Sequence, residues 1–143
     1  MSKLKIMPVA IRSVSSKYYL DGRGGEANPL MTNRDPRGDA YLNWNIERLP
    51  NGNHVIRSVS SGKYLNGKSL QLDYVGHHDH HHLGNHEHLQ WQFIKVNDRD
   101  QYAIRSISSG SYLDGRDGQP DPLLSSRNPH GDVYLSWTLE YII

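Results

Sequence analysis

The 143-residue sequence predicts an all-β domain built from three similar units, and three observations support this prediction. A fourteen-residue segment occurs three times, as AIRSVSSKYYLDGR from Ala10, VIRSVSSGKYLNGK from Val55 and AIRSISSGSYLDGR from Ala103. Apolar and polar residues alternate at the start of each copy, as they do in a half-buried strand. Ser, Gly, Asp and Asn, which favour turns, separate the short apolar runs. Such a repeat is the signature of one structural unit used several times.

Each unit is predicted to contain about four short strands. The Ile-Arg-Ser segment forms one strand, and a Ser-Ser turn leads into a second that ends at a Tyr-Leu pair. In the Asp-Gly-Arg or Asn-Gly-Lys turn that follows, we expect Gly to adopt positive φ and the Asp or Asn side chain to bond the backbone. A later strand contains a tryptophan, at Trp44, Trp91 or Trp137. We expect these tryptophans in the core, because large aromatic residues dominate burial in small domains.

Three units of about 47 residues account for the whole chain, which predicts one domain over residues 1–143. The repeats fall at approximately 1–49, 50–97 and 98–143. Twelve short strands would leave unpaired edges in an open sheet, and closure into a barrel removes these edges. We therefore expect a closed barrel with the remaining hairpins capping one end.

With these repeats, the chain resembles the β-trefoil superfamily and, within it, the ricin-B-like lectins, particularly the small cysteine-free mushroom lectins without a signal peptide. The resemblance covers essentially all 143 residues. It rests on the repeat length, the YLDGR turn and one tryptophan per unit, and it implies a twelve-stranded β-trefoil. Ricin-B repeats usually have Gln two residues before the tryptophan, where this chain has Leu42, Leu89 and Leu135. The chain also resembles the lectin-like light subunit associated with mushroom tyrosinase.

Composition argues against several functions. Lys and Arg total 16 against 15 for Asp and Glu, so no net field attracts nucleic acid or an acidic membrane. The chain contains no cysteine, no signal peptide and no apolar run that could span a bilayer, so we expect a cytoplasmic protein without membrane insertion. It also lacks a phosphate-binding Gly-rich loop and a Ser-centred nucleophile motif. We expect no catalytic activity and no cofactor, and either a monomer or a homodimer.

The first and third units share a polar segment that the second unit lacks. NRDPRGDAYLNW from Asn33 matches SRNPHGDVYLSW from Ser126 without a gap. Carboxylates, guanidinium groups and an aromatic wall are the groups that bind sugar hydroxyls and ring faces. The candidate carbohydrate-binding residues are Asp21, Arg23, Asn28, Arg34, Asp39, Tyr41 and Asn43 in the first unit, and Asp114, Arg116, Arg127, Asn128, His130, Asp132 and Tyr134 in the third; Asp35 and Asp121 lie in the same segments.

The second unit has a histidine-rich run in place of this segment. GHHDHHHLGNHEH, which begins at Gly76, contains seven of the nine histidines and is predicted to be the corresponding loop, two residues longer. Imidazole binds Ni²⁺, Cu²⁺ and Zn²⁺, but a dedicated zinc site needs ligands held in tetrahedral geometry. A solvated loop, weak metal binding and a true metal or pH-sensing role remain alternatives. The possible ligands are His77, His78, His80, His81, His82, His86 and His88.

The resemblance to ricin-B-like lectins implies a non-catalytic glycan-binding protein. In that family the Asp of the early turn usually holds the sugar hydroxyls, which corresponds to Asp21 and Asp114; Asn66 lacks the charge in the second unit. The expected ligands are glycans of the mannose, galactose or N-acetylgalactosamine type. The alternatives are a protein-binding trefoil, such as a protease inhibitor or a non-catalytic subunit of an enzyme, and a histidine-rich pH- or metal-responsive protein. A turn without a binding role also explains the Asp-Gly pairs.

Overall fold

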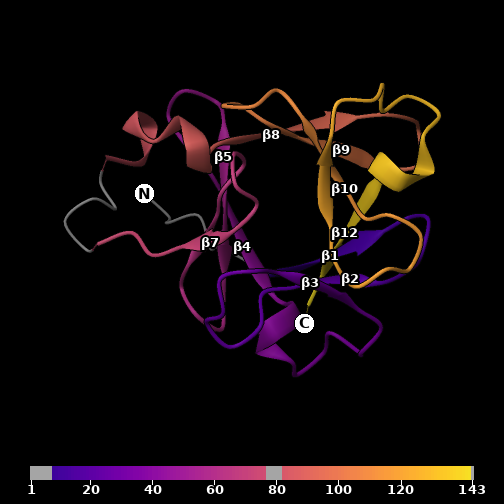
Figure 1. Cartoon of the computed structure of the whole chain (residues 1–143), viewed down its shortest axis with the longest axis horizontal. Helices are drawn as coiled ribbons and strands as arrows, with labels where there is room; N and C mark the ends of the chain where they lie inside the picture. Colours follow the sequence, from indigo (N-terminus) through magenta and orange to yellow (C-terminus); the bar gives the residue numbers. More distant parts are fainter. Residues whose placement is uncertain (1–7, 77–81, 143) are drawn as a thin grey trace, which may run out of the picture.

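A computed structural model describes residues 8–76 and 82–142, and it shows a closed barrel of six strands. Every barrel strand pairs antiparallel with two others, and the pairing of the last strand with the first closes the ring. Figure 1 shows this ring with the three repeats following one another around it. The barrel strands are β1 (Val9–Ser13), β4 (Trp44–Arg48), β5 (His54–Ser58), β8 (Trp91–Lys95), β9 (Tyr102–Ser106) and β12 (Trp137–Tyr141).

The six other strands of the described residues form three hairpins, one in each repeat. These hairpins are β2 (Tyr19–Asp21) with β3 (Leu30–Thr32), β6 (Tyr64–Leu65) with β7 (Leu72–Asp73), and β10 (Tyr112–Asp114) with β11 (Leu123–Ser125). A short 3₁₀ helix precedes each tryptophan strand: η1 (Ala40–Leu42), η3 (Glu87–Leu89) and η4 (Val133–Leu135). The described residues form twelve strands in three repeats, which confirms the predicted all-β fold class, the β-trefoil. Within residues 8–76 and 82–142, no helix has the length and apolar character that a membrane span requires.

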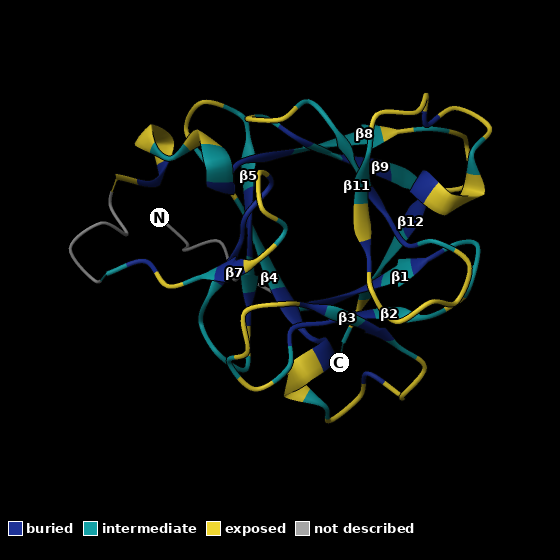
Figure 2. Ribbon diagram, viewed as in Figure 1, coloured by how far each residue is buried: buried dark blue, intermediate teal, exposed yellow. Residues whose placement is uncertain are grey.

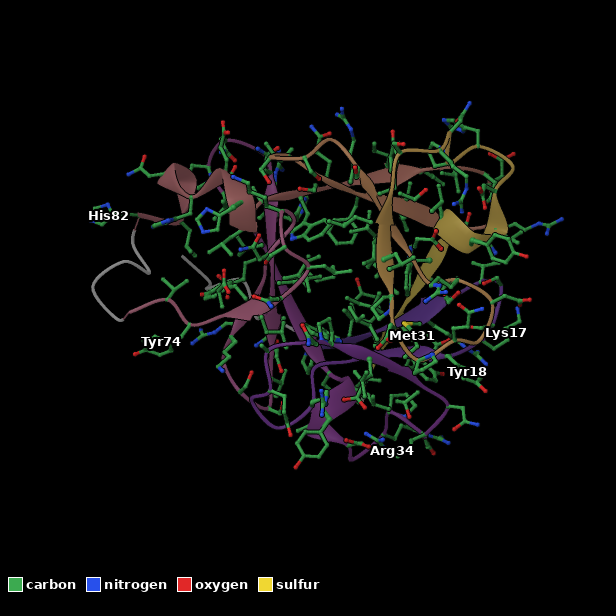
Figure 3. The ribbon with its side chains drawn as sticks, viewed as in Figure 1. Lys17, Tyr18, Met31, Arg34, Tyr74 and His82 are labelled. Carbon is green, nitrogen blue, oxygen red and sulfur yellow. The ribbon has the colours of Figure 1, made fainter. Side chains whose placement is uncertain are left out.

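The three tryptophans form the centre of the core, as predicted. Trp44, Trp91 and Trp137 are fully buried, and each indole N–H donates to a main-chain carbonyl of its own hairpin at 3.0 Å. Figure 3 shows side chains from all three repeats filling the interior of the ring. The leucines two residues before each tryptophan are also buried, so this chain uses apolar packing where ricin-B repeats usually have Gln.

The glycine in each Asp-Gly-Arg or Asn-Gly-Lys turn has a different role from the predicted one. Gly22 does not have positive φ; Arg23, the next residue, has it instead, at 59°. A Cβ atom at Gly22 would lie 2.8 Å from the hydroxyl oxygen of Ser58. Glycine is therefore required at this position for the close approach of the neighbouring repeat and the tryptophan ring, because no side chain fits there.

Each repeat holds the equivalent turn of the preceding repeat with a serine hydroxyl. Ser60 donates to the Arg23 carbonyl at 2.7 Å, and Ser15 donates to the Arg116 carbonyl at the same distance. In the third repeat, Ser109 donates to the Gly67 carbonyl at 3.0 Å. These bonds fix the turns that follow β2, β6 and β10, and the turns in the first and third repeats carry Arg23 and Arg116, two of the predicted site residues.

Candidate functional site

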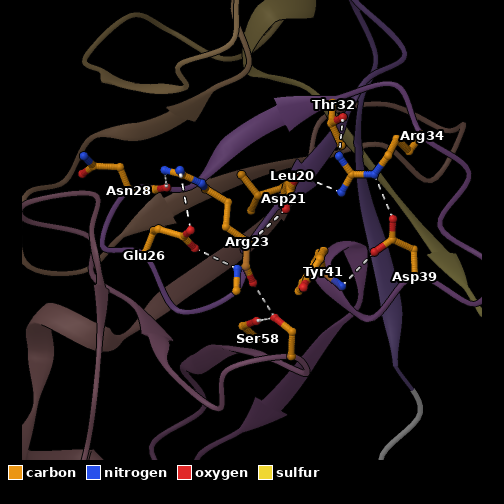
Figure 4. Close-up of polar contacts among 12 residues, drawn as sticks. Leu20, Asp21, Arg23, Glu26, Asn28, Thr32, Arg34, Asp39, Tyr41 and Ser58 are labelled. Atoms are coloured by element: carbon orange, nitrogen blue, oxygen red, sulfur yellow. Dashed lines mark hydrogen bonds and ion pairs between the residues drawn. The ribbon is translucent and has the colours of Figure 1, made fainter.

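The first repeat contains a cluster in which one arginine joins two aspartates. Arg34 donates from Nη2 to Asp21 Oδ2 at 3.1 Å and from Nε to Asp39 Oδ2 at 2.9 Å. Its Nη1 also donates to the Thr32 hydroxyl at 3.3 Å. Figure 4 shows the guanidinium group between the two carboxylates, one at the end of β2 and the other before η1. The three residues come from separate segments that the hairpin and the 3₁₀ helix bring together.

Both aspartates also bind the main chain. Asp21 Oδ1 accepts the Arg23 N–H at 2.7 Å, and Asp39 Oδ1 accepts the Tyr41 N–H at 3.1 Å, which caps η1. The Asp21 side chain is 5% exposed, whereas that of Arg34 is 48% exposed. The hydrogen bond to Asp39 raises the pKa of Arg34, and the Asp21 carboxylate raises it further. The cluster therefore presents a fixed cation whose buried side is neutralised and whose outer side faces solvent.

This cluster lies in a first-repeat hollow of about 410 Å³. Tyr41, which is 47% exposed, and Leu30 supply apolar surface beside the polar groups. Glu26 forms part of the wall and accepts the Gly24 N–H at 2.9 Å. Hydrogen bonds from the backbone of this turn lower the pKa of Glu26. The hollow thus combines acceptors, a cationic donor and an aromatic face.

The third repeat contains the same cluster 93 residues further along the chain. Arg127 donates to Asp114 Oδ2 at 3.1 Å and to Asp132 Oδ2 at 2.9 Å, as Arg34 does to its partners. The third-repeat hollow is larger, at about 650 Å³. Its wall also has more apolar surface, because Leu123, Val133 and Tyr134 are all well exposed.

The second repeat has an apolar cluster where the other two have the arginine cluster. Val75 follows β7 by two residues, as Arg34 follows β3, and its side chain is buried. Val75 packs in a cluster with Val55, Tyr64, Leu83 and Leu89. The amide of Asn66, which corresponds to Asp21, donates to Asp73 at 2.6 Å. The exposed guanidinium group between two carboxylates is therefore replaced by apolar packing.

The lengths of two loops explain this replacement. The segment between β7 and Trp91 is six residues longer than its counterpart between β3 and Trp44. The second hairpin is four residues shorter than the first, because its paired residues Tyr64 and Asp73 are nine positions apart, whereas Tyr19 and Thr32 are thirteen apart. The predicted extension of two residues is the net result of these two changes. The longer segment supplies Leu83 to the apolar cluster, and Gln90 holds it by donating to the Leu83 carbonyl at 3.0 Å.

Most of the predicted site residues lie in the two hollows. Asn28 lies near the first-repeat hollow but outside its wall, and the side chain of Asn128 accepts the His130 N–H in a turn. Asn43 is buried away from the hollow, and Asp35 pairs with Arg37. The residues found in the first-repeat hollow are Asp21, Arg23, Arg34, Asp39 and Tyr41, and those in the third-repeat hollow are Asp114, Arg116, Arg127, His130, Asp132 and Tyr134.

The sequence interpretation missed wall residues in both hollows. They lie in the loop between the two hairpin strands, at the start of the second hairpin strand or at the shared Gly-Asp pair, and several are apolar. A leucine at the same position of the first and third repeats, Leu30 and Leu123, is a signal that could have indicated part of the walls. The residues missed are Gly24, Glu26 and Leu30 in the first repeat, and Asp117, Gln119, Leu123, Gly131 and Val133 in the third.

Three of the seven clustered histidines lie in the described part of the chain. His86 and His88 pack with their rings edge to face, 5.5 Å apart, and His82 is exposed. Figure 3 shows Tyr74 and His82 on the side of the molecule away from Arg34. Among residues 8–76 and 82–142, no group of three or more His, Asp or Glu could hold a metal ion. The other predicted ligands, His77, His78, His80 and His81, lie outside the described residues.

Comparisons with solved structures agree with the β-trefoil fold. The chain is similar to the designed 3-fold symmetric protein ThreeFoil, with a TM-score of 0.73, 20% identity and coverage of 94% of this chain and 99% of that one. It is similar to SeviL, solved bound to asialo-GM1 saccharide, with a TM-score of 0.72, 16% identity and coverage of 97% and 100%.

A third similar structure is the GlcNAcα1-4Gal-releasing endo-β-galactosidase from Clostridium perfringens. The TM-score is 0.79 at 11% identity, and 97% of this chain matches 34% of the enzyme, about a third of its length. No protein-family model and no curated protein sequence matches the chain. The shared property is therefore the fold, and the function has to be argued from the two hollows.

Proposed function

We propose that this protein is a non-catalytic carbohydrate-binding protein with one sugar site in the first-repeat hollow and one in the third. The observation that carries the proposal is the repeated cluster: an exposed arginine between two carboxylates, beside an exposed tyrosine, occurs twice with the same hydrogen bonds. Folding alone does not require this cluster, because the second repeat keeps the same strands with Val75 in its place.

The exposed groups have the chemistry that sugar recognition needs. A carboxylate oxygen accepts more than one hydrogen bond, so Asp39 can accept sugar hydroxyls while it holds Arg34. The outward N–H groups of Arg34 can donate to hydroxyl or ring oxygens, and the Tyr41 ring offers a face for sugar C–H groups. The Asp21 side chain is only 5% exposed, against 22% for Asp39, so we assign Asp21 the role of positioning Arg34. Asp132, Arg127, Tyr134 and Asp114 have the same roles in the third repeat.

Two similar structures are consistent with this proposal, because both contain a bound saccharide. SeviL was solved with the asialo-GM1 saccharide, and Polyporus squamosus lectin was solved with the epitope Neu5Acα2-6Galβ1-4GlcNAc. The balance of charges in the hollows favours neutral sugars, since each arginine is already paired with two carboxylates. We therefore propose glycans of the mannose, galactose or N-acetylgalactosamine type as ligands.

A glycan array followed by calorimetry tests the proposal. Tyr41→Ala and Tyr134→Ala remove exposed rings from the two hollows, and Tyr74→Ala removes an even more exposed ring from the second repeat as a matched control. We expect about two sites per chain in the wild type, one in each single variant and none in the double variant. Each site is expected to be weak, with a dissociation constant on the order of 1 mM, because a shallow hollow buries few ligand atoms.

Two results would contradict the proposal. An array without any bound glycan would remove the carbohydrate function. Glycan binding that survives in the double variant but is lost in Tyr74→Ala would place the site in the second repeat instead.

A further inference from the structure

A third hollow lies between the hairpins of all three repeats, and we call it the inter-repeat hollow. It measures about 430 Å³, and its wall includes Asn28, Ser69, Leu70, Asp121, Leu123 and Leu124. Asn28 comes from the β2–β3 loop, Ser69 and Leu70 from the β6–β7 turn, and the others from the third hairpin. The inter-repeat hollow is therefore a product of how the three repeats meet.

The shortened turn of the second repeat creates this hollow. Met31 donates its main-chain N–H to the Pro120 carbonyl of the third repeat at 2.7 Å, and Leu72 donates to the Ala27 carbonyl of the first repeat at the same distance. The third link of this kind would join Leu124 to the second repeat. Measured between its paired residues, the second hairpin is four residues shorter than the other two, and it lacks the acceptor segment. In the described residues, Leu124 accordingly makes no such bond.

The inter-repeat hollow and the third-repeat hollow share a wall. Leu123 contributes to both, and its side chain is 46% exposed. Figure 2 shows β11 as partly exposed, because Leu123 is exposed and the other two residues of the strand are half-buried. Leu30, the corresponding residue of the first repeat, lines the first-repeat hollow but not the inter-repeat hollow. A ligand at Arg127 can thus extend over Leu123 into a second hollow, which has no counterpart beside Arg34.

The inter-repeat hollow has an apolar floor and a polar rim. Leu70 and Leu124 pack against the main core, so the floor is fixed from below. Leu70 holds this position with a φ of 57°, which is strained for a leucine. Asn28, Ser69 and Asp121 are exposed around the rim, where an amide, a hydroxyl and a carboxylate can bind hydroxyl groups. This arrangement suits a second sugar ring better than a purely apolar ligand.

We propose that the third-repeat site binds an oligosaccharide that extends across Leu123 into the inter-repeat hollow, whereas the first-repeat site binds only a terminal sugar. This inference rests on the proposed function and adds the class of ligand to it. Both sites hold the first ring with an arginine and an aspartate. The ring that follows meets the fixed surface of Leu70, Leu123 and the polar rim only in the third repeat.

The test compares sugars of increasing length in the full chain carrying Tyr41→Ala, so that only the third-repeat site binds. Calorimetry is done with mannose and α-linked mannotriose, and with galactose, lactose and the asialo-GM1 saccharide. We expect the longer member of the series that binds to do so about tenfold more tightly than its monosaccharide. In a chain carrying Tyr134→Ala, where only the first-repeat site binds, we expect no gain with length.

A blocking variant shows whether the gain comes from the inter-repeat hollow. Ser69→Trp places a large ring on its rim, and Lys68→Trp places the same ring on an adjacent exposed residue outside the wall. We expect Ser69→Trp to abolish the tenfold gain and keep monosaccharide binding, and Lys68→Trp to change neither. Asn28→Trp blocks the opposite rim and replaces Ser69→Trp if that variant fails to fold.

The outcomes separate this inference from the proposed function. Equal affinities for the monosaccharide and the longer sugars would overturn the extended site and leave the sugar sites in place. A gain with length that survives in both blocking variants would do the same. No binding of any sugar would overturn the proposed function, and the extended site with it.

Discussion

The first and second repeats have the same strands but opposite kinds of loop chemistry. In both, the tryptophan indole binds the hairpin carbonyl at 3.0 Å, and the same barrel pairings are formed. The first repeat then places Arg34 between two carboxylates, whereas the second buries Val75 in an apolar cluster. The comparison shows that the β-trefoil frame tolerates either arrangement, so the arginine cluster is not needed to form it.

Replacement of Val75 by arginine, the residue found at the corresponding position of the first repeat, has the largest expected effect. Val75→Arg would place a guanidinium group in the apolar cluster without the two aspartates that Arg34 has, and we expect a loss of about 4 kcal/mol in the free energy of unfolding. Val75→Ala serves as the control, with an expected loss of about 2 kcal/mol for the cavity alone. Chemical denaturation measures both. Equal losses in the two variants would show that the second repeat accepts the charge and that the comparison is wrong.

Replacement of the buried aspartate separates its two roles. Asp21→Asn keeps the acceptor for the Arg23 N–H, as Asn66 does for the Lys68 N–H in the second repeat, but removes the charge that faces Arg34. We expect the free energy of unfolding to fall by about 1 kcal/mol in Asp21→Asn and by about 2 kcal/mol in Asp21→Ala. Alanine also removes the acceptor for the Arg23 N–H in the turn. Denaturation of both variants, and of the matched pair at Asp114, measures the difference.

Sugar binding by Asp21→Asn tests whether the charge of Asp21 is needed to orient Arg34. If Asp21→Asn keeps the fold and loses sugar binding in the first repeat, the charge that orients Arg34 is required. A variant that unfolds as readily as Asp21→Ala would contradict the two-role assignment, because the turn would then depend on the charge.

The fold could be predicted from the sequence because its determinants recur at regular spacing. The repeated strand segment, the Tyr-Leu pair and the tryptophan are each required for packing in every repeat, and Trp44, Trp91 and Trp137 are buried as expected. The arginine cluster could be found in part, since the first and third copies align without a gap. Its internal geometry could not, because the sequence does not show that Asp21 is buried and bonded through both oxygens.

Contacts between repeats could not be predicted from the sequence. The role of Gly22 depends on Ser58 of the next repeat, so the turn pattern alone suggested positive φ instead. The inter-repeat hollow depends on a hairpin that is four residues shorter, a change that the six added residues after it conceal in the sequence. Side chains and loops that meet only after the barrel closes leave no local pattern along the chain.

A smaller effect is expected at the first turn of the repeat. Gly62 and Gly110 have φ of 75° and 72°, whereas Lys17 occupies the same position in the first repeat with φ of 68°. A side chain in this conformation costs about 1 kcal/mol relative to glycine, so Lys17→Gly is expected to stabilise the protein by about that amount. Gly62→Lys should destabilise it comparably. Thermal unfolding measures both, and destabilisation by Lys17→Gly would contradict the equivalence of the three turns.

The smallest effect concerns His54, a residue peculiar to the second repeat. Its counterpart in the first repeat is Val9, and both pair with the tryptophan strand. Burial lowers the pKa of His54, and the charge of Arg48 lowers it further. The ring packs edge to face on Phe93 at 5.3 Å, and within the described residues its buried Nδ1 has no hydrogen-bond partner. The folded protein therefore favours the neutral ring.

The sign of the pH dependence follows from this pKa. Above the ordinary histidine pKa of about 6.5, the ring is neutral in the folded and unfolded states, and His54 adds no pH dependence. Below it, the unfolded chain binds the proton more readily, so stability falls as pH decreases towards the lowered folded pKa. His54→Val copies the first repeat and removes this dependence. Thermal unfolding from pH 8 to pH 5 should show the wild type losing stability relative to His54→Val below about pH 6.5; parallel curves would mean that the imidazole is as accessible to protons in the folded protein as in the unfolded chain.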